Sequence, residues 1–276
     1  DKILTDWNGL MIDALAYSGF VFENQQFISS ASAAADRILK EFRNSEGHLY
    51  HRFRDGEAAI EGQLDDYAFF LKGLLTLYQS TQQPKWLRSA DGLAGQMVSK
   101  FQDATDGTFY MTLGSEDDYL ISRPKDFQDG ALPAGSSVAA YTLLEAGALM
   151  QNSQLEQTGR RLVEATAGHA ESSGTSFSYL LQAVDFALGP VKEVVLSADK
   201  LSDAKPFLDV MRSEFLPRTV VVVRTQGDDE FVREFLPYAV LQSPIDHLPT
   251  AYICKDHVCQ LPTTDIDKFS NNLNQK

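Results

Sequence analysis

Residues 63–78 read QLDDYAFFLKGLLTLY, and this stretch decides the fold. Two carboxylates, Asp65 and Asp66, stand where a helix should begin, and the residues behind them are apolar on nearly every side rather than along one stripe. Such a pattern predicts a helix that is buried all round. An aspartate in the first turn can cap free backbone N–H groups and faces the positive end of the helix dipole. We therefore expect an inner-layer helix whose acidic end faces a loop-lined opening.

The same pattern recurs along the chain as a helical hairpin every ~60 to 70 residues, a longer period than that of solenoid repeats. Buried helices are predicted from 5 to 16, from 64 to 78 and from 134 onwards, the last with Ser136 or Ser137 as its cap. More polar helices are predicted at 25–42, at 84–101 and up to about 170, and a seventh at 175–188. The polar starts DWN (6–8), DDY (65–67) and GSS (135–137) fall at matching positions.

The predicted fold is mainly α, with residues 1–189 forming a partial (α/α) toroid of helical hairpins around a pocket at the polar ends. Residues 47–56 alternate and end in Asp-Gly, which predicts a short β-hairpin. After Gly189-Pro190 the pattern changes to two buried strands, 193–196 and 219–223, with a helix between them. Two further strands, 251–254 and 258–261, and a terminal helix complete a small α/β subdomain at 190–276.

Composition narrows the possible partners. The net charge of −14 argues against binding to nucleic acid or to an anionic membrane, since both need a basic surface. No apolar run reaches the length of a membrane span, no signal peptide opens the chain, and two cysteines suit a reducing compartment, so we expect a cytoplasmic protein. The chain opens at Asp1 without a methionine, which suggests a piece of a longer protein.

Asp65 and Asp66 are the candidate catalytic residues. An apolar wall and a like-charged neighbour would raise one pKa, as glycosidic chemistry requires. Neighbouring residues on a helix point roughly 100° apart, so at most one should face a pocket. The alternative is structural: one aspartate caps the helix and the other pairs with an arginine from a loop.

Several residues are candidates for substrate binding. Trp7 and Asn8 suit a sugar, since an indole stacks on a pyranose ring and an amide reads hydroxyls, although packing of Trp7 is an equal alternative. The long connection 106–133 is expected to be functional, and its Arg123, Lys125, Asp126 and Asp129 are either a ligand clamp or surface ion pairs. His48 or His51 is a candidate for proton transfer. The remaining predicted contacts are Tyr67, Arg52, Ser136 and Ser137.

Cys254, Cys259 and His257 resemble a metal-binding trio, but their spacing is not that of a zinc site, and we predict neither a metal nor a cofactor. No GxGxxG or phosphate-binding loop is present in the sequence. If Asp256 and His257 form a two-residue turn, the cysteines form a cross-strand pair that could bridge. The favoured alternative is two small buried strand residues without a bridge.

Four segments carry a resemblance to a known family. They are DKILTDWNGLM at 1–11, LDDYAF at 64–69, PAGSSVAA at 133–140, and TAYIC at 250–254 with Cys259. Together they resemble the YyaL-type family, also called the spermatogenesis-associated protein 20 family. The resemblance implies an N-terminal thioredoxin-like domain, absent from this sequence, and a six-hairpin barrel similar to N-acylglucosamine 2-epimerase. It also implies a redox role for the cysteine pair as one hypothesis.

Two functions follow. The first is an enzyme that hydrolyses or epimerises a carbohydrate with Asp65 or Asp66; the Arg/His/Glu/His set of sugar epimerases is missing, which disfavours epimerisation. The second is a non-catalytic binding or redox-associated module. Because seven helices cannot close a toroid, we further expect exposed inner-layer apolar surface and, as a partner, either the rest of the full-length protein or a second copy.

Overall fold

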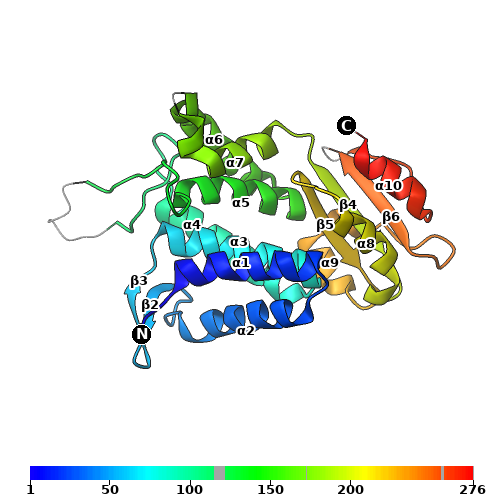
Figure 1. Cartoon of the computed structure of the whole chain (residues 1–276), viewed down its shortest axis with the longest axis horizontal. Coiled ribbons are helices and arrows are strands. Elements are labelled where there is room, and N and C mark those ends of the chain that lie inside the picture. Colours follow the sequence, from blue (N-terminus) through cyan, green and yellow to red (C-terminus); the bar gives the residue numbers. More distant parts are fainter. Residues whose placement is uncertain (115–121, 172, 256–257, 276) are drawn as a thin grey trace. The chain divides into compact units, whose positions relative to one another are not determined.

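The computed structural model describes residues 1–114, 122–171, 173–255 and 258–275 (Figure 1). The chain divides into two compact units, a helical unit and an α/β unit. The helical unit comprises Asp1–Ala146 and Gln154–Ala187, and the α/β unit comprises Gly147–Ser153 and Leu188–Lys276. This division counts residues 147–153, which include the last turn of helix α5 (Gly135–Met150), with the α/β unit, whereas the sequence analysis placed the boundary at residue 189.

Helical hairpins make up the first unit, as predicted. Among the described residues its α-helices are α1 Thr5–Val21, α2 Gln25–Glu41, α3 Leu64–Thr81, α4 Pro84–Phe101, α5 Gly135–Met150, α6 Ser153–Thr166 and α7 Ser178–Leu188. Two 3₁₀ turns, Ala167–Glu171 and Gly174–Phe177, lie between α6 and α7.

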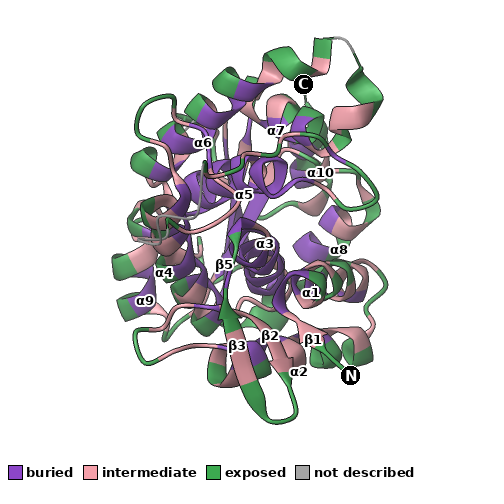
Figure 2. Cartoon of the chain, turned by 90° about the vertical axis from the view of Figure 1, so that its left-hand side faces the viewer, coloured by how far each residue is buried: buried purple, intermediate pink, exposed green. Residues whose placement is uncertain are grey.

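Helix α3 is the centre of the helical unit. Its side chains are buried on all faces, as Figure 2 shows by the purple of its ribbon, which confirms the prediction from residues 63–78. Helix α1 packs so closely against α3 that the backbones of the two helices are in contact at Gly9 and Gly73. A Cβ atom added at Gly9 would lie 2.6 Å from the Phe69 carbonyl carbon, and one at Gly73 would lie 3.0 Å from the Gly9 oxygen. Only glycine permits this approach of the two helices.

Helix α1 differs from the prediction of a helix buried all round. It buries one face, which includes Ile12 and Ala16, whereas Trp7, Met11 and Tyr17 are 59%, 57% and 57% exposed. These three side chains form an exposed apolar stripe on the first inner helix.

The internal repeat extends to the connections after α2 and α4. The Tyr50 N–H donates to the Phe42 oxygen at 2.8 Å, and the Tyr110 N–H donates to the Phe101 oxygen at 2.8 Å. In each case a glycine with a φ near +80° stands three residues earlier, at 81° and 77°. The two connections therefore return in the same way to the last turn of an outer helix.

A three-stranded sheet of β1 Ile3–Leu4, β2 Tyr50–Arg54 and β3 Glu57–Glu61 follows the first of these connections. The predicted hairpin is confirmed: Asp55 and Gly56 form its turn with φ values of 53° and 85°, the signs that a type I′ turn requires. Strand β1 was not predicted, because two residues carry no periodicity.

The α/β unit contains a four-stranded sheet in the order β5 (Thr219–Arg224), β4 (Lys192–Ser197), β6 (Thr250–Lys255), β7 (Val258–Cys259). Strands β4 and β5 are parallel and α8 (Lys205–Ser213) connects them, which confirms the predicted βαβ unit. Helix α10 (Ile266–Asn274) was predicted; α9 (Asp229–Phe235) was not, and two 3₁₀ turns lie at Leu201–Ala204 and Pro237–Ala239. Among the helices that the structure describes, none has the length and apolar character to span a bilayer.

Candidate functional site

The starts of α1, α3 and α5 meet in space. The backbone N–H of Asp6 donates to Asp66 Oδ1 at 3.0 Å, and the backbone N–H of Gly135 donates to the Asp65 carboxylate. A Cβ atom at position 135 would lie 2.1 Å from Asp65 Oδ1, so a larger residue here would displace the Asp65 carboxylate. The three polar starts that the sequence places at matching positions are thus joined by hydrogen bonds.

Asp66 is the centre of these bonds, and it is fully buried. Besides the Asp6 N–H, its carboxylate accepts the Gln63 N–H at 2.8 Å, which caps α3, and the His51 ring nitrogen Nδ1 at 3.0 Å. A carboxylate so placed cannot meet a substrate directly. The structure therefore corrects the prediction of Asp66 as a catalytic carboxylate and supports the capping alternative.

His51 reaches this site from strand β2. The bond to Asp66 holds the proton on Nδ1 and leaves Nε2 as the free acceptor of the neutral ring. Its pKa is raised, mainly because Asp66 accepts this hydrogen bond, although partial burial acts in the opposite direction. His48, the other candidate, lies 3.4 Å from Glu46 and is not part of the site.

Asp65 is the titratable carboxyl of the group. Burial, and then the neighbouring charges of Asp66, Asp6 and Asp126, raise its pKa from 3.8 to about 6, against the opposing effect of the Gly135 N–H. The pKa of Asp6 is also raised, first by burial. A carboxyl with a pKa near 6 exists in both protonation states close to neutral pH, which suits a general acid or base.

Asp6, His51 and Asp66 also place one potential metal-ligand atom each within 4.8 Å of one another. Two backbone N–H groups and the His51 ring already donate to Asp66. Cation binding would compete with all three bonds. The arrangement is thus a hydrogen-bonded cluster rather than a preformed cation site, and the prediction of no metal is not tested by it.

Three of the predicted binding residues, Trp7, Ser136 and Ser137, differ in exposure. The Trp7 indole is exposed at the start of α1. The hydroxyls of Ser136 and Ser137 are buried without a hydrogen-bond partner among the described residues. They lie in the first turn of α5 and do not cap it, because α5 begins at Gly135. Arg52 alternates with His51 on β2, so its side chain leaves the strand on the opposite face.

Other predicted binding residues have structural roles. Tyr67 is buried, and its hydroxyl accepts the Leu49 N–H at 3.1 Å. The Asn8 amide donates to the Leu4 oxygen at 2.7 Å. Burial removes Tyr67 from contact with a sugar. Asn8 is half-buried, and its role in binding stays a prediction.

The long connection after α4 is also held internally in its described part. The Arg123 guanidinium donates to the Thr112 and Lys100 carbonyl oxygens, and Lys125 pairs with two aspartates at 2.7 Å. Asp129 is buried and accepts the backbone N–H groups of Ala134, Tyr179 and Leu180, so it caps α7. The ion pairs of Lys125 agree with the alternative given for this segment, and the ligand clamp of Arg123, Lys125, Asp126 and Asp129 stays a prediction.

Sequence reasoning missed a buried polar network between the inner helices. Lys72 of α3 donates to both oxygens of Glu145 of α5, at 3.1 and 3.2 Å, and lies 3.8 Å from Asp13 of α1. Burial lowers the pKa of Lys72, but these two carboxylates outweigh it and raise the pKa well above its usual value. The available signal was one charged residue inside the apolar run of each helix, Lys72 in α3 and Glu145 in α5.

In the α/β unit, Cys254 and Cys259 form a disulfide. The predicted cross-strand pairing is confirmed, and the favoured alternative of two unlinked strand residues is wrong. His257 and Asp256 lie outside the described residues.

Comparisons with known proteins agree with this architecture. No family model matches the chain. Human spermatogenesis-associated protein 20 is 27% identical over 274 residues, with 96% of this chain and 35% of the human protein covered. The rat protein of that name is 26% identical over 285 residues, covering 100% and 36%. The chain therefore spans about a third of the length of these relatives.

Solved structures show the fold. The GH76 α-mannanase of Bacteroides thetaiotaomicron matches with a TM-score of 0.55 at 11% identity, covering 98% of this chain and 68% of that one. The unsaturated glucuronyl hydrolase of Bacillus sp. GL1 matches with a TM-score of 0.50 at 18% identity, covering 66% and 58%. The chain thus resembles the YyaL-type or spermatogenesis-associated protein 20 family over essentially its whole length, as its motifs predict, and it has the α/α hairpin fold of six-hairpin glycoside hydrolases.

Proposed function

We propose that the helical unit binds a carbohydrate at the cluster of Asp6, His51, Asp65 and Asp66 and acts on it by acid–base chemistry, with Asp65 as the proton-transferring carboxyl. The observation that carries this proposal is the meeting of the polar starts of three inner helices, where Asp66 accepts the Asp6 N–H and the His51 ring nitrogen and Asp65 accepts the Gly135 N–H. Burial and neighbouring carboxylates also raise the pKa of Asp65 to about 6. The choice of a carbohydrate as substrate is supported by the two proteins that share the fold, which are named as a glucuronyl hydrolase and an α-mannanase.

Each member of the cluster has a distinct role in the proposal. Asp65 donates a proton to a leaving oxygen, a step that needs a carboxyl protonated near neutral pH. His51, held by Asp66, offers Nε2 as an acceptor for a proton from water or from a sugar hydroxyl. The exposed Trp7 indole supplies a stacking face for the sugar.

Hydrolysis fits this set better than epimerisation does. Hydrolysis uses one protonated and one ionised group on either side of a glycosidic bond, and Asp65 with Asp6 or His51 provides such a pair. The Arg/His/Glu/His set of sugar epimerases is missing from the sequence. We therefore propose glycoside hydrolysis as the reaction, with Asp66 as the residue that positions His51.

The test uses the chain against a panel of oligosaccharides and 4-nitrophenyl glycosides, with melting temperature for binding and reducing-end release for turnover. A bound sugar should raise the melting temperature, because it binds the folded state alone. Asp65→Asn should keep the Gly135 bond through its amide oxygen but abolish turnover. Asp55→Asn is the matched control, since Asp55 is an exposed hairpin-turn residue with a φ of 53° that asparagine tolerates.

The second candidate function is a non-catalytic carbohydrate-binding module. The hydrogen bonds of Asp65 and Asp66 to the backbone favour this function, because they give both carboxylates a structural role. Asp66 accepts two backbone N–H groups and Asp65 accepts one. A sugar that raises the melting temperature of both the unchanged chain and Asp65→Asn, without any release of reducing ends, would support binding alone. If no sugar in the panel shifts the melting temperature, both carbohydrate functions are rejected.

A further inference from the structure

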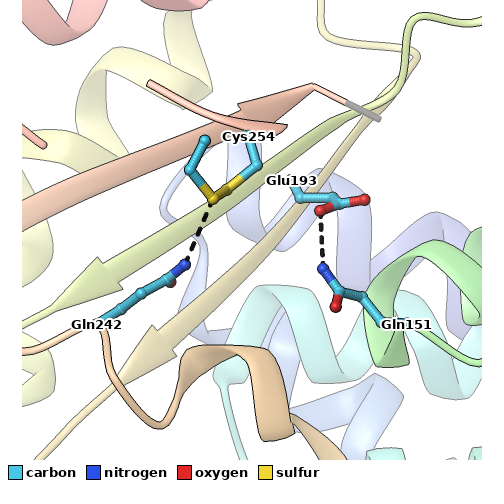
Figure 3. Close-up of a disulfide and its surroundings, with 5 residues drawn as sticks. Gln151, Glu193, Gln242 and Cys254 are labelled. Carbon is cyan, nitrogen blue, oxygen red and sulfur yellow. Dashed lines mark hydrogen bonds between the residues drawn. A yellow bond between two sulfur atoms is a disulfide. The ribbon is translucent and has the colours of Figure 1, made fainter. Parts of the chain in front are cut away.

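The disulfide lies in the last hairpin of the α/β unit (Figure 3). Cys254 and Cys259 are paired residues of β6 and β7, and β7 is the edge strand of the sheet. Cys254 is 1% exposed, whereas Cys259 is an exposed residue. One half of the bridge thus faces the interior and the other half faces solvent.

This bridge contributes little as a structural cross-link. It joins residues only five apart in sequence, and a short loop removes little freedom from the unfolded chain. Strand β7 pairs with β6 at two positions, while β4 pairs with β5 and with β6 at six positions each. The sheet therefore keeps nearly all of its pairing when the bridge opens.

Polar groups surround the bridge on its buried side. Glu193 of β4 is 2% exposed and lies directly opposite Cys254 in the register of β4 and β6. Paired residues of neighbouring strands point to the same face, so the Glu193 side chain leaves the sheet on the same face as that of Cys254. Gln151 donates to Glu193 Oε2 at 3.1 Å, and Gln242 Nε2 lies 3.9 Å from Cys259 Sγ (Figure 3).

We propose that Cys254–Cys259 is a redox-active disulfide that exchanges with a dithiol, with Glu193 as the proton donor and acceptor for Cys254. This inference concerns the α/β unit and is independent of the proposed carbohydrate function. A buried thiol is a poor nucleophile unless a neighbouring group takes its proton. A buried carboxylate opposite Cys254 meets that need.

A thiolate of the dithiol attacks Cys259 Sγ, a new S–S bond forms there, and the Cys254–Cys259 bond breaks. Cys254 leaves as a thiolate and takes the proton of the Glu193 carboxyl. The second thiol of the dithiol then attacks its own bound sulfur and releases Cys259, which is protonated from solvent. The dithiol is oxidised to a disulfide, the protein gains two electrons and two protons, and Glu193 is reprotonated from solvent.

The test equilibrates the folded chain with mixtures of reduced and oxidised dithiothreitol and traps free thiols with a maleimide. We expect full and reversible conversion between the bridged and open forms. The circular dichroism spectrum should show that the chain stays folded throughout. In reoxidation, Glu193→Gln should slow the closing step by on the order of 100-fold, the lower range of acid–base contributions. The control Glu230→Gln, at an exposed glutamate of the same unit, should reoxidise at the original rate.

Two results would overturn the proposal. The first is a bridge that opens only under conditions that unfold the sheet, which would make it a structural cross-link. The second is reoxidation of Glu193→Gln at the rate of the control. If Glu193→Gln does not fold, single-cysteine chains decide instead: Cys259 in Cys254→Ser should alkylate at least about tenfold faster than Cys254 in Cys259→Ser, since a nucleophile needs access. Equal alkylation rates of the two cysteines would overturn the proposal, because Cys259 would then be no more accessible to attack than Cys254.

Discussion

Replacing Asp65 by asparagine is expected to stabilise the helical unit at pH 8. The folded protein raises the pKa of Asp65 from 3.8 to about 6, so the folded state holds this proton more tightly than the unfolded state does. The contribution of Asp65 to the free energy of unfolding is therefore fully present below pH 3.8, and it is lost as the pH rises through about 6. At ~1.4 kcal/mol per pH unit, the ionised carboxylate costs about 3 kcal/mol above that range. Partial exposure of the side chain reduces this to roughly 1 to 2 kcal/mol.

The assay is urea unfolding followed by circular dichroism at pH 8 and at pH 5, with Asp55→Asn as the control. Asp65→Asn should raise the free energy of unfolding by about 1 to 2 kcal/mol at pH 8, which is about 2 to 8 °C in melting temperature for a unit of this size. The gain should shrink at pH 5, where the unchanged carboxyl is largely protonated. An Asp65→Asn protein that is less stable than the unchanged chain at both pH values would refute the reasoning. Asp65 would then be needed as a charged cap of α5.

Three further results are expected. Asp66→Ala leaves two buried backbone N–H groups without an acceptor and should lower the free energy of unfolding by roughly 3 to 5 kcal/mol; a histidine titration by NMR should show the pKa of His51 falling back. Glu145→Gln removes the nearest carboxylate from buried Lys72 and should cost roughly 3 kcal/mol in urea unfolding, whereas Glu145→Leu combined with Lys72→Met should cost less, because no unpaired charge remains. The chain should self-associate through the apolar stripe of α1, and Met11→Glu should shift it toward the monomer in light scattering; an unchanged monomer in both cases would contradict this.

Sequence reasoning succeeded where the signal is local. The helix at Leu64 is predictable because an apolar run of that length with acidic residues at its start has few alternatives. The hairpin at Asp55-Gly56 follows from turn chemistry, and the parallel strands of the α/β unit follow from two β-branched runs with a helix between them.

It failed where a side chain serves a distant segment. Ser136 was expected to cap its own helix, but Asp65 of α3 receives the first N–H of α5 instead. Asp129 caps α7 from 50 residues away. The partnership of Lys72 and Glu145 spans 73 residues. Local propensities contain no information on such pairs, since the partner is set by how helices pack.

The contact of Gly9 with the backbone of α3 has a mechanical consequence. Two helices that touch through their backbones cannot slide past each other, because no flexible side chain lies between them to adjust. This packing fixes the register of α1 against α3 and, with it, the position of the Asp6 N–H beside the Asp66 carboxylate. Strand β2, which carries His51, is tied to the start of the same helix, because it pairs with β1 and the Thr5 hydroxyl donates to the Tyr50 oxygen at 2.6 Å.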